Sequence, residues 1–304
     1  MSDDISSSQS SVDLSPKFCR LEYRTPAYEP LAALYKDALG LNEVEPGLLR
    51  SVDGGFELAF KVLPDSTRDS ETTVGLYHVA FLLPSRAALA ATLRRVFAAV
   101  RSATERRAET AAPDGARSAA VNGFSGPAFF IEGATDHLVS EAVYLRDADG
   151  NGVELYADRD PSEWRRDAEG NIAMDTVELD MAGLLASAPS TEGICAGSSI
   201  GHLHFHVPDL DSAEAFYRKN LGLKVTQRRY PGARFLAWGG YHHHLGINTW
   251  AKDRRAPQGA AGLVRVRLSE PPPGASPSSG AEPQPGAVPR RELGPDPAGI
   301  IWSW

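Results

Sequence analysis

The sequence predicts an α+β fold of four modules, each a strand, a helix and further strands, arranged as two pairs. Two internal repeats carry this prediction. Residues 34–41 (LYKDALGL) recur as residues 216–223 (FYRKNLGL), and residues 75–81 (GLYHVAF) recur as residues 262–268 (GLVRVRL). Both copies of the first repeat follow an alternating, strand-like segment and end in Gly-Leu. This pattern indicates a helix that packs an aromatic ring on the core and is closed by a glycine.

These repeats divide the chain into modules, a tail and a connector. Residues 1–16 are rich in Ser and Asp and predict a disordered tail. The connector is expected to hold a short helix near residues 181–188. The segments expected are module one at 17–70, module two at 71–160, the connector at 161–198, module three at 199–251 and module four in the remainder.

Module two and module four each contain an irregular stretch. In module two, Pro84-Ser85 and the apolar spacing that follows predict a helix over residues 85–101. Residues 102–134 are small and polar, and we expect a long loop inserted there. Residues 271–297 hold nine of the 22 prolines of the chain. So many prolines exclude the helix of a complete module, so the fourth module is expected to be truncated.

Composition bounds the classes of function. The chain has 304 residues, 42% of them hydrophobic and 23% charged, which is typical of a globular protein large enough for two domains. A net charge of −8 argues against a nucleic-acid surface, and no apolar run predicts a membrane span or signal peptide. Cys19 and Cys195 suggest neither disulfides nor a cysteine zinc site. We therefore expect a cytoplasmic protein with a small-molecule partner.

The histidines are the most informative residues. Of the eight in the chain, six lie in two clusters, at positions 202, 204 and 206 and at positions 242–244. His78 and His137 stand in short segments of their own. Because imidazole is the commonest protein ligand of first-row metals, this concentration predicts a metal site. Alternation along a strand would place the first cluster on one face, but its ends lie roughly 13 Å apart, so the three cannot bind one ion.

Three motifs resemble those of the vicinal oxygen chelate superfamily, which includes glyoxalases, bleomycin-resistance proteins and extradiol dioxygenases. The first is residues 201–210 (GHLHFHVPDL) followed by Phe216-Tyr217, and the second is the hairpin and strand at 147–156 (DADGNGVELY). With residues 136–141 (DHLVSE) and Tyr241-His242-His243-His244, the pattern is similar to two-domain catechol-2,3-dioxygenase-like proteins. The resemblance covers about residues 18–268.

The resemblance implies paired βαβββ modules whose strands form two open, barrel-like sheets around a divalent metal. It implies a first glyoxalase-like domain at residues 17–160, containing the insertion, and a second at residues 199–304, whose Pro-rich C-terminal module is truncated. Residues 161–198 would connect the two domains.

Within each pair of modules the resemblance calls for a histidine on both first strands and a carboxylate on a last strand. Neither pair is complete, because Arg20 and Arg265 stand at two histidine positions and Ile301 or a neighbour replaces one glutamate. The metal ligands expected, taken from modules two and three, are His78, Glu154 and His202. Some glyoxalases build sites in this crosswise manner within a chain or between subunits, so a homodimer stays open.

Two imidazoles and one carboxylate form the facial triad of non-haem Fe(II) oxygenases. The interpretation is therefore an extradiol-type dioxygenase of aromatic catabolism that binds Fe(II), or else Mn(II), a catechol-like diol and dioxygen. One alternative is a glyoxalase-like isomerase or lyase with Ni(II) or Zn(II) and a fourth ligand. Another is a non-catalytic binding protein that sequesters a small molecule.

The resemblance also implies residues that act on the substrate. His244 falls where extradiol enzymes carry an acid–base histidine, whereas glyoxalases usually have a carboxylate ligand there. His243 is then expected to face away. Tyr144, ten residues before Glu154, matches an active-site tyrosine, and His137 could also hydrogen-bond a metal-bound substrate.

Overall fold

The computed structural model describes residues 15–67, 72–110, 129–190, 193–273 and 292–304. Residues 1–14 of the tail expected over 1–16 and most of the Pro-rich segment lie outside these residues, and Ser15 and Pro16, which are described, are buried. The helices and short helical turns, in chain order, are α1 (Glu29–Ala32), which continues as the π-helix η1 (Ala33–Ala38), α2 (Arg86–Thr110), the 3₁₀ turn η3 (Pro161–Glu163), α3 (Met181–Ala186) and α4 (Leu210–Leu221).

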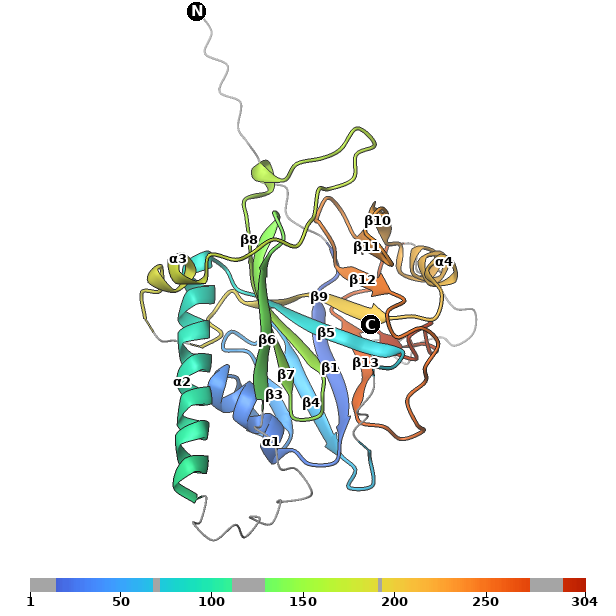
Figure 1. The fold of residues 1–304 in the computed structure, drawn as a ribbon. Helices are drawn as coiled ribbons and strands as arrows, with labels where there is room; N and C mark the ends of the chain where they lie inside the picture. The colour runs from blue at the N-terminus through green and yellow to red at the C-terminus, as the bar shows by residue number, and fades with distance from the viewer. Residues whose placement is uncertain (1–14, 68–71, 111–128, 191–192, 274–291) are drawn as a thin grey trace, which may run out of the picture.

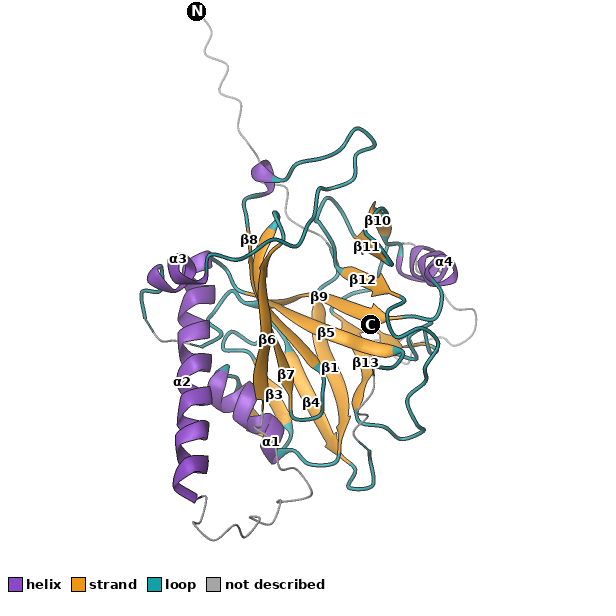
Figure 2. Cartoon of the chain, viewed as in Figure 1, coloured by secondary structure: helices purple, strands orange, loops and turns teal. Residues whose placement is uncertain are grey.

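Two mixed sheets make up the β-structure, and neither closes into a barrel (Figure 2). The seven-stranded sheet contains, in spatial order, β14 (Glu292–Leu293), β15 (Ile301–Ser303), β13 (Gly262–Leu268), β1 (Phe18–Thr25), β4 (Glu57–Val62), β3 (Leu48–Arg50) and β2 (Asn42–Glu45). The eight-stranded sheet contains β10 (Lys224–Gln227), β11 (Ala233–Ala237), β12 (Leu245–Asn248), β9 (Ser199–His206), β5 (Gly75–Leu82), β8 (Gly152–Asp158), β7 (Ser140–Asp147) and β6 (Phe129–Asp136).

The predicted modules account for this topology. Modules one, two and three each have a strand, a helix and three strands, which are β1 to β4, β5 to β8 and β9 to β12. In the described part of module four, β13, β14 and β15 are present without a helix, as expected of a truncated copy. Each sheet combines one module from either half of the chain: modules two and three share one, and modules one and four share the other. The crosswise arrangement is therefore intramolecular. The two domain boundaries stay a prediction.

The helices of the first repeat follow the expected pattern. Tyr35 and Tyr217 are fully buried in the core between the sheets. Gly222 ends α4 in the left-handed conformation (φ 66°), as a helix-closing glycine does, and Asp209 caps its start by accepting a hydrogen bond from the Ser212 backbone N–H. Figure 1 shows α1 and α2 on one flank of the sheets and α4 on the other.

The two tyrosines also mark a pseudo-symmetry. The Tyr35 hydroxyl donates to Asp147 Oδ2 at 2.9 Å, and the Tyr217 hydroxyl donates to Asp296 Oδ2 at 2.8 Å. Both aspartates are buried and lie in tight turns before the last strand of their modules. Burial raises the pKa of Asp147 to about 6. Each tyrosine thus joins the helix of one module to the final turn of the next.

Two connecting segments differ from expectation. The loop expected over 102–134 is wrong at both ends, because α2 continues to Thr110 and β6 begins at Phe129; residues 111–128 lie outside the described part. The short helix expected near 181–188 is present as α3. No helix among the described residues is long and apolar enough to cross a membrane.

Candidate metal centre

The three predicted ligands come from three adjoining strands at the centre of the eight-stranded sheet. His78 lies on β5, which pairs in parallel with β8 and antiparallel with β9. In this register Ala80 of β5 is opposite both Glu154 on β8 and His202 on β9. Since residues i and i+2 of a strand share a face, the side chains of His78, Glu154 and His202 meet on one side of the sheet.

The donor atoms of these side chains converge. One ligand atom from each lies within 4.8 Å of the other two, and the side chains are buried, with 5%, 2% and 2% of their surface exposed. Oε2 of Glu154 is 3.0 Å from Nε2 of His78 and 3.1 Å from Nε2 of His202. No fourth His, Cys, Asp or Glu among the described residues joins this group.

The electrostatics and the donor atoms of the site fit a divalent cation. Burial alone would raise the pKa of Glu154, but His202 and His78 beside it hold that pKa well below its usual value. Burial lowers the pKa of His202, which favours the neutral imidazole that binds metals. Nε2 of His78 and Nε2 of His202 both face the Glu154 carboxylate, and neither has another partner among the described residues. A metal ion bound between these buried atoms would satisfy all three groups.

Small residues leave room for the triad. Ala80 lies between the two flanking ligands with no side chain beyond Cβ. Gly152 of β8 is opposite His78, and a Cβ there would lie 2.2 Å from the carbonyl oxygen of Tyr77 and 2.9 Å from Cβ of His78. Glycine at position 152 therefore lets β5 and β8 approach closely enough to share a metal.

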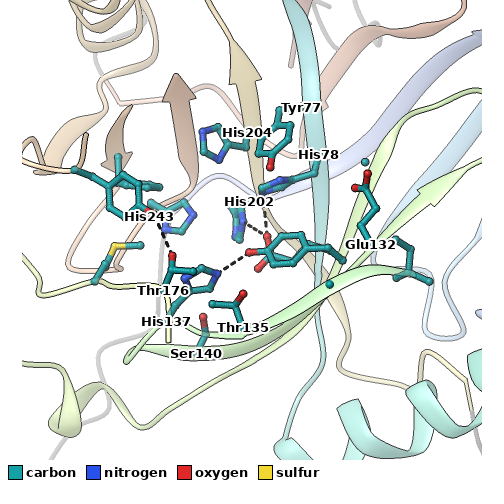
Figure 3. Close-up of a pocket in the computed structure, with 18 of the residues that line it drawn as sticks. Tyr77, His78, Glu132, Thr135, His137, Ser140, Thr176, His202, His204 and His243 are labelled. Carbon is teal, nitrogen blue, oxygen red and sulfur yellow. Dashed lines mark hydrogen bonds and ion pairs between the residues drawn. The ribbon is translucent and has the colours of Figure 1, made fainter. Parts of the chain in front are cut away.

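The triad opens into a cavity of about 400 Å³ (Figure 3). The side chains that line the cavity are largely aromatic and polar. One of them, Thr176, comes from the connector, and its hydroxyl lies 3.0 Å from the hydroxyl of Tyr230. Trp250 is 44% exposed and belongs to the same wall. The residues lining the cavity that the sequence did not single out include Tyr77, Glu132, Thr135, Thr176, Tyr230, Phe235 and Trp250. No local motif marks them, because they come from separate strands and loops.

Tyr144 and His137, the two residues expected to contact the substrate, both line this cavity. Tyr144 on β7 is opposite Glu154 in the sheet register, and its ring centroid is 5.6 Å from that of His78. Its hydroxyl is 2.6 Å from Nε2 of His137, while Nδ1 of His137 lies 2.8 Å from the carbonyl oxygen of Asp175. Because a carbonyl only accepts, a neutral His137 carries its proton on Nδ1 and accepts the hydroxyl of Tyr144. Burial and Glu154 raise the pKa of Tyr144 well above its usual value.

The orientation expected for the second histidine cluster is reversed. His243 lines the cavity, with its ring centroid 4.1 Å from that of His202, whereas His244 does not line it. Nδ1 of His244 instead accepts a hydrogen bond from the backbone N–H of Trp238 at 3.2 Å, and its ring packs on that indole. The physical reason is that β12 begins only at Leu245, so these residues lie in a loop where strand alternation does not apply.

His204 and His206 share a face with His202 but do not join the triad. Asn248 bridges them: Nδ1 of His206 donates to Oδ1 of the amide at 2.6 Å, and Nδ2 of the amide donates to Nε2 of His204 at 3.0 Å. Burial lowers the pKa of His204 well below its usual value. The two rings are therefore neutral, hydrogen-bonded fillers of the concave face.

The corresponding place in the seven-stranded sheet holds ion pairs. In the seven-stranded sheet, Arg265 of β13 is opposite Ile301 of β15, as His78 is opposite Gly152 in the other sheet. Two residues further along, Arg267 is opposite Ser303, as Ala80 is opposite Glu154. Ser303 thus occupies the glutamate position. Arg20 occupies the position of His202, since it pairs with Arg267 as His202 pairs with Ala80.

These two arginines are held by carboxylates. Arg20 donates to Glu22 at 3.2 Å and to Glu57 at 2.9 Å, and Arg265 pairs with Glu22 and Glu292. Guanidinium groups cannot bind a cation, so this copy of the site has lost its ligands.

Comparison with known proteins gives a family for part of the chain. Residues 199–271 match the model of the "Glyoxalase/Bleomycin resistance protein/Dioxygenase superfamily". A "Catechol-2,3-dioxygenase" of Bacillus subtilis (strain 168) is 40% identical over 200 residues, which are 64% of this chain and 58% of the relative. The chain therefore matches little more than half the length of that relative.

The fold has a counterpart among solved structures. A proposed dioxygenase from Bacillus subtilis subsp. subtilis strain 168 superposes with a TM-score of 0.53 at 11% identity, over 95% of this chain and 84% of the other. At that identity the likeness concerns the fold.

Proposed function

We propose that this chain, which matches the glyoxalase, bleomycin-resistance protein and dioxygenase superfamily over residues 199–271, is a metal-dependent extradiol-type dioxygenase of that superfamily. The substrate proposed is a catechol-like vicinal diol, and the metal is Fe(II), with Mn(II) as the second choice. The 40% identical relative named a catechol-2,3-dioxygenase supports this class of reaction.

The observation that carries the proposal is the triad of His78, Glu154 and His202, whose donor atoms lie within 4.8 Å of one another. Two imidazoles and one carboxylate are the donor set of non-haem Fe(II) oxygenases. An ion bound there would supply a Lewis-acid centre with open positions for a chelating diol and for dioxygen. The Glu154 carboxylate would neutralise one of its two positive charges inside the buried site.

The surrounding side chains have definable tasks. The aromatic wall formed by Tyr77, Phe235 and Trp250 excludes water and packs against the faces of a planar ring. The Tyr144 hydroxyl, between Glu154 and His137, is placed to hydrogen-bond a diol oxygen. His243, on the opposite side of the triad, is placed to take a proton from a diol hydroxyl and to return it later. In this proposal it replaces His244 as the acid–base residue.

The glyoxalase-like alternative requires a fourth protein ligand. The candidate group holds three donors among the described residues, and the histidine at position 243 is not one of its members. This favours the dioxygenase over an isomerase that uses Ni(II) or Zn(II) with four ligands. A binding protein without a metal would have no need for two buried imidazoles that converge on one buried carboxylate.

Anaerobic loading with Fe(II), followed by addition of catechol and air-saturated buffer, tests the proposal. We expect uptake of one dioxygen per catechol and a yellow ring-cleavage product. Glu154→Gln and His202→Gln should bind little iron and produce none. Protein that binds Fe(II) in a 1:1 ratio yet consumes no dioxygen with catechol or its alkyl- and aryl-substituted forms would overturn the proposed reaction.

A further inference from the structure

A chain of hydrogen-bonding groups leads from the cavity wall to the end of β8. Nδ1 of His243 lies 2.7 Å from Nδ1 of His242, and Nε2 of His242 lies 2.8 Å from Oδ1 of Asp158. His242 is fully buried and does not line the cavity, and Asp158 is the last residue of β8. The three groups are thus connected in the order carboxylate, imidazole, imidazole.

The Asp158 carboxylate, at the end of this series of hydrogen bonds, determines which ring nitrogens carry protons. An ionised carboxylate only accepts, so Nε2 of His242 carries a proton and donates it to Asp158. If His242 is neutral, its Nδ1 has a lone pair, and Nδ1 of His243 must donate to it. A His243 ring with a single proton therefore carries it on Nδ1. Its Nε2 then has a lone pair for the cavity that the ring lines.

Further contacts fix the carboxylate and the loop. The Tyr241 hydroxyl donates to Oδ2 of Asp158 at 2.8 Å, and that hydroxyl is also 2.8 Å from the Tyr156 hydroxyl. The Thr226 hydroxyl donates to the backbone carbonyl of His242 at 2.5 Å. Asp158 therefore presents Oδ1 to the imidazole in one direction, and the ring of His242 is held between strands.

We propose that Asp158 and His242 are positioning residues that hold His243 as the Nδ1–H tautomer, so that its Nε2 accepts a hydrogen bond from a substrate hydroxyl. This inference rests on the proposed function and names a requirement on the substrate. The ligand must carry a hydroxyl on the side of the metal opposite Tyr144, because Nε2 of His243 is an acceptor there. A diol with that oxygen methylated would leave Nε2 unpaired.

The tautomer can be measured directly on metal-free protein labelled with ¹⁵N-histidine. Long-range ¹H–¹⁵N correlation spectra distinguish a protonated from a bare ring nitrogen, without any catalysis. In the wild type we expect His243 to have a bare Nε2 and His242 a bare Nδ1. A wild-type spectrum with the proton of His243 on Nε2 would overturn the proposal.

Variants give the second readout. His242→Leu removes the acceptor, so His243 should shift to the Nε2–H form, and kcat for catechol should fall by about 10- to 100-fold with iron content unchanged. His242→Asn places an amide oxygen near the lost Nδ1 and should restore the tautomer and most of kcat. Thr226→Val, which removes hydroxyl contacts to the backbone carbonyls of Phe235 and His242 but none to the His242 ring, is the matched control and should leave the tautomer unchanged.

The outcomes separate this inference from the proposed function. An unaltered tautomer in His242→Leu, or a Thr226→Val variant that changes it equally, would contradict the positioning role. A wild type that shows the expected tautomer but never cleaves catechols would refute the dioxygenase proposal and leave the assignment of Asp158 and His242 intact.

Discussion

Glu154→Gln should abolish the stabilisation that a divalent metal gives this fold. A ligand that binds only the native state stabilises it by RT ln(1 + [L]/Kd), which is about 2.7 kcal/mol at a hundredfold excess over Kd. All three donors are buried, on three strands that come together only in the folded chain, so the unfolded state lacks the site. For a chain of 304 residues this free energy corresponds to a rise in Tm of about 5 °C.

The assay is thermal unfolding, followed by circular dichroism, with and without Fe(II) under argon, and again with Mn(II). Gln has the size of Glu but no charge, so the buried dication would lose its only anionic ligand. We expect no measurable metal-induced shift in the variant. Each protein serves as its own metal-free reference, so any change in intrinsic stability cancels.

A matched control is available on the neighbouring strand. Glu141 of β7 is also buried, but it pairs with Arg86 outside the cavity. Glu141→Gln should keep the full metal-induced shift, whatever its effect on the metal-free protein. If Glu154→Gln retained a shift equal to the wild type, or if no divalent metal stabilised the wild type, the triad would not be a metal site.

Three further predictions concern other parts of the structure. Burial raises the pKa of Asp147 from 3.8 to about 6, so the stability that the protonated carboxyl contributes is present below pH 3.8 and is lost as the pH rises through 6. In urea titrations the free energy of unfolding of the wild type should fall by about 3 kcal/mol over that interval relative to Asp147→Asn. Parallel pH profiles for the two proteins would contradict this. Gly152→Ala should force β5 and β8 apart, costing about 1–3 kcal/mol of stability and weakening metal binding in calorimetry, whereas Gly133→Ala, with open space at its Cβ, should change neither. His243→Ala should lower kcat by about 10²- to 10⁴-fold with iron retained, and His244→Ala should have the smaller effect; the reverse order would refute the assignment from the cavity.

Much of the fold was accessible from the sequence because its signals are local or repeated. The Gly-Leu endings predicted the helix end that Gly222 makes, and strand alternation predicted that His202 and His204 share a face. The crosswise sheet followed from incomplete ligand sets in each half, with arginine at positions 20 and 265. A helix end, the face of a strand and a repeated module each depend on one element or on two similar copies, so they can be predicted without knowing the rest of the fold.

Other features depend on context that periodicity does not contain. Helix α2 extends through residues 102–110, which are rich in Ala, Arg and Glu, all good helix formers. The sequence predicted a loop there because Ser, Thr and other small or polar residues lie among them. The choice between His243 and His244 depends on where β12 begins, which the triple histidine does not reveal. Ser303 could be matched to Glu154 only through the pairing of β15 with β13.

The exchange of modules between the sheets has a consequence for synthesis on the ribosome. The eight-stranded sheet, which carries the candidate metal centre, needs nothing beyond Asn248, so it can form before the strands that follow have been synthesised. The other sheet must wait, since Phe18 near the start of β1 pairs with Leu268 of β13. Strand β1 would lack its β13 partner until Leu268 has been synthesised, and such long-range closure is slow. Nascent chains of this protein should therefore acquire a metal-competent centre before they acquire their full resistance to proteolysis.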